Sequence, residues 1–187
     1  MQDPIQDWLN DPTIPAPIRQ ALQSGLRLDR IELDSEGRFW HQGEPIDDAR
    51  IEGLFHRSIE RTPGGTYLLA VPPFRYPIVV RDMPYRVTAI AIPDAPGLTD
   101  GPPPSIRIRL DDDSEEDLDI DTLRHQPGRG LICQVKGRTM TARFSRPSYY
   151  ALAQCLELPS SGVDLPDGEE PDPVLVLGAL RHPIPRV

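Results

Sequence analysis

Cysteine is scarce in this chain of 187 residues. The two cysteines, Cys133 and Cys155, do not form a Cys-x-x-Cys pair. Their number and spacing exclude a disulfide scaffold and a cysteine-based metal or redox site. Both are therefore expected to be reduced, buried, small apolar side chains.

Long apolar runs are absent as well. No run approaches the roughly 20 residues that cross a bilayer, and residues 1–4 (MQDP) lack the basic and apolar regions of a secretory signal. We expect a cytoplasmic protein without a membrane partner.

Lysine is almost missing, because 19 of the 20 basic residues are arginine and only Lys136 is lysine. Arginine binds phosphate or carboxylate bidentately, so the composition is compatible with an anionic ligand. A GC-rich genome would produce the same composition without any ligand, and both interpretations stay open.

Proline, in contrast, is abundant. The 23 prolines amount to more than twice the usual share of about 5%. Because proline interrupts helices and central strands, the regular elements must be short, which argues against a coiled coil or an all-helical bundle.

Charge is unevenly distributed along the chain. The formal net charge is −9, and residues 111–121 (DDDSEEDLDID) alone hold 8 acidic and no basic residues. Residues 50–86 carry six arginines against three acidic residues. The overall charge argues against binding a nucleic acid polymer, whereas the locally positive segment permits an anionic small molecule.

Two segments of the chain repeat one pattern. Residues 31–41 alternate around a turn and predict a β-hairpin. A helix capped by Asp47 should follow, with one buried stripe of apolar residues: Ile51, Leu54, Phe55 and Ile59. Residues 131–144 and 148–158 repeat this hairpin and helix, with Ser145 or Ser148 as the cap. We interpret the repeat as an internal duplication in an α+β fold with antiparallel sheets.

The predicted organisation has five parts. They are an N-terminal helical arm (1–27), a first α+β unit (28–92), a Pro/Gly-rich linker (93–104), a second α+β unit (105–158) and an acidic, Pro-rich tail (159–187) with an edge strand at 174–179.

Five segments together resemble an uncharacterised bacterial family, the domain-of-unknown-function family DUF1285. They are DSEGRFWHQGEPI at 34–46, LF at 54–55, YLL at 67–69, IVVRDMPY at 78–85 and ARFSRPSYYAL at 142–152. The resemblance implies a duplicated α+β fold whose C-terminal half is like a pleckstrin-homology domain. It also implies a nucleotide-like ligand between the two halves and a role in signal transduction. Residues 24–29 (SGLRLD) replace the family's Cys-Gly-Asp-like segment, so the ligand could differ here.

Catalytic and metal-binding motifs fail in their details. Asp117, Asp119 and Asp121 repeat the spacing of a calcium loop, but its glycine and its last glutamate are missing. The four histidines show no metal-binding spacing, and no dinucleotide or phosphate loop is present. We therefore assign no catalytic residue, metal or cofactor, and an enzyme is the least favoured class.

The candidate ligand-binding residues are arginines and aromatics, mainly from the family-like segments: Trp40, Arg81, Asp82, Arg143, Arg146 and Tyr149. Arginine would bind an anion, and the aromatic rings would stack on a base. Asp82 is equally consistent with a structural role in a turn, and the aromatics with a place in the core.

The lead hypothesis is a non-enzymatic ligand-binding or regulatory protein with an anionic, nucleotide-like ligand between its halves. The alternative is an adaptor that binds a protein partner through the acidic run and the Pro-rich segments. The sequence indicates no oligomeric state.

Overall fold

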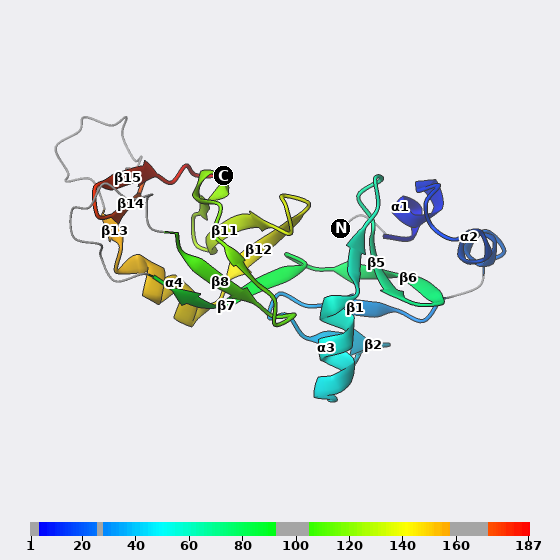
Figure 1. Ribbon diagram of the computed structural model, residues 1–187. Coiled ribbons are helices and arrows are strands. Elements are labelled where there is room, and N and C mark those ends of the chain that lie inside the picture. Colours follow the sequence, from blue (N-terminus) through cyan, green and yellow to red (C-terminus); the bar gives the residue numbers. More distant parts are fainter. Residues whose placement is uncertain (1–3, 26–27, 93–104, 158–171) are drawn as a thin grey trace. The chain divides into compact units, whose positions relative to one another are not determined.

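The computed structural model describes residues 4–25, 28–92, 105–157 and 172–187. The chain forms two compact units, residues 1–85 and 86–187 (Figure 1). In the described residues the first unit has three short α-helices and the second has one, and in both units most strand pairs are antiparallel. The α+β prediction is therefore confirmed.

The first unit contains a six-stranded sheet and three helices. The helices are α1 (Pro4–Asn10), α2 (Ala16–Gln23) and α3 (Ala49–Arg57); the strands are β1 (Ile31–Leu33), β2 (Phe39–His41), β3 (Glu44–Pro45), β4 (Ile59–Arg61), β5 (Tyr67–Val71) and β6 (Phe74–Val80). The sheet order is β3-β2-β1-β6-β5-β4. β1 and β6 are parallel, and the remaining pairs are antiparallel.

The N-terminal arm packs on this sheet through a buried aspartate. Asp11 accepts hydrogen bonds from the Thr13 backbone N–H at 2.9 Å and from the Thr62 hydroxyl. Burial opposes ionisation of Asp11, but hydrogen bonds from Thr13, Thr62 and Thr66 outweigh it and lower its pKa to about 2. The arm is thus anchored to the β4–β5 turn.

Helix α3 differs from the prediction in two ways: another residue caps its N-terminus, and other side chains are buried along it. Asp48, not Asp47, accepts hydrogen bonds from the N–H groups of the first turn, at 2.8 Å from Arg50 and 3.3 Å from Ile51. Ile51 is 41% exposed and Leu54 42%. The helix ends at Arg57, so the predicted stripe is broken before Ile59, which is buried in β4.

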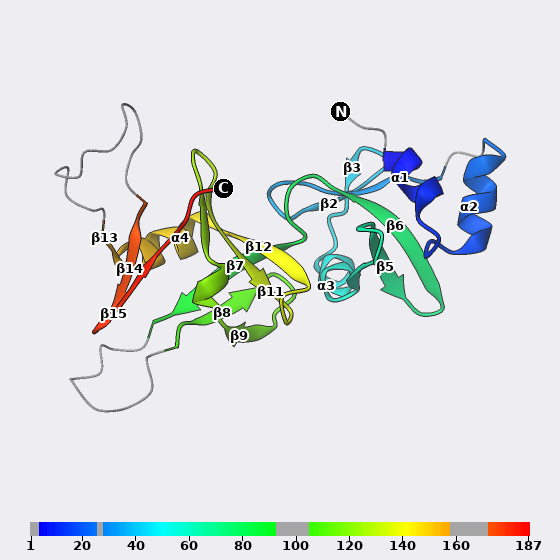
Figure 2. The same cartoon turned by 90° about the horizontal axis from the view of Figure 1, so that it is seen from above.

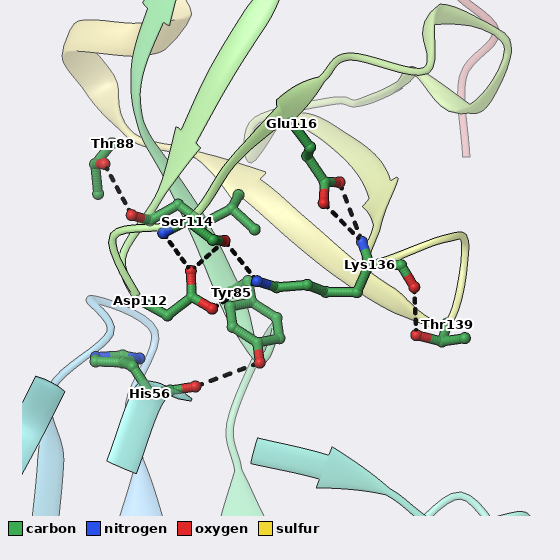
Figure 3. Close-up of polar contacts among 9 residues, drawn as sticks. His56, Tyr85, Thr88, Asp112, Ser114, Glu116, Lys136 and Thr139 are labelled. Atoms are coloured by element: carbon green, nitrogen blue, oxygen red, sulfur yellow. Dashed lines mark hydrogen bonds and ion pairs between the residues drawn. The ribbon is translucent and has the colours of Figure 1, made fainter. Parts of the chain in front are cut away.

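His56 is the buried residue of α3. Its Nε2 lies 3.0 Å from the Gly37 carbonyl oxygen in the β1–β2 turn, and its ring contacts Phe39 edge-on. The Tyr85 hydroxyl donates to the His56 carbonyl at 3.3 Å (Figure 3). Of the predicted stripe within the helix, Phe55 is half-buried and contacts Phe39 edge-on, and His56 supplies the buried position.

The second unit is built on another six-stranded sheet, of order β10-β11-β12-β7-β8-β9. Its strands are β7 (Tyr85–Ala91), β8 (Arg107–Leu110), β9 (Glu115–Asp117), β10 (Arg124–Gln126), β11 (Gly130–Val135) and β12 (Met140–Phe144), with a 3₁₀ turn at Ile120–Thr122. Helix α4 (Arg146–Ala153) follows β12. Hairpin plus helix, and a six-stranded sheet, thus recur in both units, as the duplication requires.

The division between the units differs from the predicted one. β7 pairs with β8 and neighbours β12, so it belongs to the second unit, and the units divide after Tyr85. The predicted linker at 93–104 lies outside the described residues.

Helix α4 is shorter than its prediction. Ser145 caps it, and it ends at Ala153. The Cys155 carbonyl then accepts the Val176 N–H at 2.7 Å, which draws the chain out of the helix into β13 (Leu156–Glu157). β13 pairs with β14 (Val174–Leu177), and β14 with β15 (Leu180–Pro183). The strand expected at the edge in 174–179 is therefore central.

Cys133 is buried and Cys155 is half-buried, and both are free thiols. Burial raises the pKa of Cys133 to about 12, which makes it a poor nucleophile. No helix in the described ranges is long and apolar enough to cross a membrane.

Candidate functional site

The second unit contains a cavity of about 320 Å³ between the β10–β11 turn and helix α4. Eight residues line it: His125, Gly128, Arg129, Gly130, Phe144, Arg146, Tyr149 and Tyr150. Cationic and aromatic side chains predominate, and no carboxylate is among the eight. An anion would therefore meet no fixed negative charge in this lining.

Two glycines shape the turn that forms one wall. Gly128 and Gly130 have φ values of 72° and 91°, a region that side-chain-bearing residues rarely adopt. The Arg129 N–H donates to the Gln126 carbonyl at 2.9 Å. This tight turn presents Arg129, which is exposed, at the cavity.

Arg143 supports this turn from within the unit. It is 8% exposed, and its guanidinium donates to the Arg129 carbonyl and to the Gln126 side-chain oxygen, both at 2.7 Å. Arg143 is not among the lining residues. Arg143, one of the six predicted ligand-binding residues, thus holds the turn in position and does not line the cavity.

Helix α4 supplies the opposite wall. Ser145 caps the helix by accepting the Ser148 N–H at 3.4 Å. Arg146 is exposed, and the rings of Tyr149 and Tyr150 meet edge to face at 5.8 Å between centroids. Of the six predicted ligand-binding residues, Arg146 and Tyr149 line this cavity, and their role in binding stays a prediction.

His125 contributes a further polar side chain to the lining. Its backbone is held in β10, and its ring is half-buried. Within the part of the chain that the structure describes, the buried Nδ1 makes no hydrogen bond. Buried polar atoms of this kind are costly and call for an explanation, which a bound ligand or water would provide.

The other three predicted residues belong to the first unit and are used within it. Trp40 donates its indole N–H to Asp34 at 2.8 Å. Arg81 forms an ion pair with Glu32 at 2.6 Å, and Asp82 is half-buried in the bend after β6. A cavity of about 370 Å³ in the first unit is lined mainly by residues of α1, of the β4–β5 turn and of β6 instead. The predicted site therefore combined residues of two different compact units.

The sequence prediction missed six lining residues: His125, Gly128, Arg129, Gly130, Phe144 and Tyr150. A signal existed at residues 128–130 (Gly-Arg-Gly), which fail as a dinucleotide fingerprint but form a turn with an arginine at its tip. Its distance in sequence from Arg146 conceals that both face one cavity.

Half of the eight acidic residues of the run are paired with cations of the second unit. Four of its residues form ion pairs: Asp112–Lys136 (2.6 Å), Glu115–Arg109 (2.8 Å), Asp117–Arg107 (3.4 Å) and Asp119–Arg138 (2.6 Å). Lys136, the single lysine, also donates to Ser114, and its backbone N–H donates to Glu116 at 3.1 Å (Figure 3). No group of three metal-ligating side chains occurs within the described ranges.

Comparisons with known proteins bear on the fold. No family model matches the chain, and no curated protein matches it. Two crystal structures of DUF1285 family proteins do. The one from Silicibacter pomeroyi DSS-3 is 17% identical, with 83% of this chain and 80% of that chain covered and a TM-score of 0.59. The one from Shewanella baltica OS155 is 14% identical, with 68% and 92% covered and a TM-score of 0.52. The chain therefore has a DUF1285-like fold, as the sequence motifs predicted; the likeness to pleckstrin-homology domains stays a prediction.

Proposed function

We propose that the protein is a non-enzymatic, regulatory ligand-binding protein whose ligand is a small, anionic, nucleotide-like molecule held in the cavity between the β10–β11 turn and α4. The observation that carries this proposal is the lining itself. Arg129 and Arg146 face a space that also contains Tyr149 and Tyr150, without an acidic residue among the eight lining residues.

The two arginines suit a phosphate group. A guanidinium binds phosphate oxygens through parallel N–H bonds, which a lysine ammonium does not match. Arg146 forms no ion pair with any described residue, so an anion would not have to displace a partner from it. The aromatic rings of α4 offer faces for a base.

The cavity volume limits the size of the ligand. About 320 Å³ is close to the lower end of the roughly 300–1,000 Å³ range of small-molecule sites. A single nucleotide fits this size better than a dinucleotide. No serine, threonine, cysteine or carboxylate lines the cavity, and we assign no reaction to it.

Thermal-shift and calorimetric titrations of the full chain test the proposal. Adenosine monophosphate should raise the Tm at millimolar concentration, whereas a cyclic dinucleotide should raise it less. Arg146→Ala should weaken binding at least about tenfold, because a charge-assisted bond contributes about 1.5–3 kcal/mol. Arg38→Ala is the matched control, since Arg38 is an exposed arginine of the first unit, beside Trp40.

Two results would contradict the proposal. If neither a mononucleotide, a phosphosugar nor inorganic phosphate shifts the Tm, or if both variants bind as the wild type does, the cavity is not an anion site.

The adaptor alternative has less support. Four acidic residues of the run are held in ion pairs within the second unit, and Asp112 is 7% exposed. A basic protein partner would have to compete with these intramolecular cations.

A further inference from the structure

The last described segment of the chain, residues 184–187, lies against the cavity wall. We call these four residues the strap. Ile184 is fully buried, and its N–H donates to the Pro173 carbonyl at 2.8 Å. In Figures 1 and 2 the strap is the red segment that leads from β15 to the C-terminal label.

The strap pairs with β10 in parallel. The His125 N–H donates to the Pro185 carbonyl at 2.9 Å, and the Val187 N–H donates to the His125 carbonyl at 3.1 Å. β11 occupies the other edge of β10. Both backbone polar groups of His125, a lining residue, are thus fixed by the strap.

The opposite wall is tied to the same small sheet. Helix α4 leads into β13, whose Leu156 and Glu157 pair with β14. β14 in turn pairs with β15, from which the strap continues. The β14–β15 hairpin therefore connects, through backbone hydrogen bonds, to both walls of the cavity.

We infer that the strap regulates the cavity: its docking on β10 holds the His125 wall in the form that binds the anionic ligand, so that strap docking and ligand binding favour each other. The inference rests on the proposed function. If strap docking has already ordered the His125 wall, the ligand does not lose binding free energy by ordering it. Because coupling between two binding equilibria is reciprocal, ligand binding must in turn stabilise the docked strap.

A matched pair of variants isolates one of the two strap bonds. Val187→Pro removes the N–H that donates to His125, and Val187→Ala keeps it. Val187 is 63% exposed, so neither substitution disturbs the core. Amide hydrogen exchange in the full chain then reports on the strap, because the His125 amide is the donor of the second bond.

In the ligand-free protein, Val187→Pro should speed exchange of the His125 amide about fivefold, the typical effect of losing one hydrogen bond, and Val187→Ala should leave it unchanged. Val187→Pro should weaken binding of adenosine monophosphate about threefold to fivefold. In the wild type and in Val187→Ala, the nucleotide should slow exchange of the Val187 amide.

The outcomes separate the strap from the proposed function. If the nucleotide binds the wild type and both variants equally, or leaves exchange at Val187 unchanged, the strap inference is wrong and the proposed function stands. If no anion binds the wild type, the proposed function fails first and the coupling fails with it. Ile184→Ala, which removes a fully buried side chain, provides a stronger second variant and should weaken binding further.

Discussion

At the scale of single residues, two adjacent aspartates in the β8–β9 turn, Asp111 and Asp112, have pKa values shifted in opposite directions. Asp112 is ion-paired with Lys136, and this pairing, with hydrogen bonds from Ser114, outweighs the effect of burial and lowers its pKa. Burial instead raises the pKa of Asp111 to about 7. Their order in the sequence does not reveal this difference, because it depends on which carboxylate faces the lysine.

The raised pKa of Asp111 makes folding depend on pH. Between the ordinary value of 3.8 and about 7 the folded state holds a proton that the unfolded chain releases. The free energy of unfolding therefore falls as pH rises through this window. Asp111→Asn should flatten this fall and stabilise the protein at pH 8 by on the order of 2 kcal/mol relative to the wild type.

Urea unfolding at pH 5 and pH 8 measures the effect, with the exposed Asp113→Asn as control. An equal pH dependence in the wild type and in Asp111→Asn would contradict it. Asp11 acts in a separate window, because its pKa of about 2 makes stability fall as pH drops below 3.8.

At the scale of elements, helix α3 shows how a local signal can be displaced by one residue. Asp47 and Asp48 are both exposed and both suit a cap by residue type. Asp48 has an extended backbone, and its side chain accepts hydrogen bonds from the N–H groups of the first turn.

This geometry predicts different effects for the two neighbours. Asp48→Ala should destabilise the protein by about 1 kcal/mol, because two N–H groups of the helix lose their acceptor. Asp47→Ala should change stability by less than about 0.5 kcal/mol. Equilibrium unfolding of both variants checks this, and equal losses would show that the cap is shared.

The length of helix α4 is also set by contacts with residues that are distant in the sequence. Helix α4 stops at Ala153 since the following residues pair with β14, about twenty positions along the chain. The apolar pattern of 148–158 is compatible with either structure, and only the partner strand selects one.

At the scale of the whole molecule, the position of the cavity leads to a further prediction. All eight lining residues lie within 86–187. Residues 86–187 produced alone should therefore bind adenosine monophosphate within about threefold of the affinity of the full chain.

Calorimetric titration of that fragment, after its amide spectrum shows it to be folded, tests the prediction. Loss of binding in a folded fragment would show that binding also requires residues 1–85.

The sequence by itself determined the α+β class, the two hairpin-plus-helix repeats, the buried thiol of Cys133 and the DUF1285-like fold. These follow from local periodicity, turn residues and motifs that stand in one stretch of chain. Tertiary structure alone decided that β7 joins the second sheet, that Arg143 positions a turn, and that Arg129 and Arg146 share a cavity from which Trp40 and Arg81 are absent. Such outcomes depend on strand pairing and packing between distant residues, which periodicity does not encode.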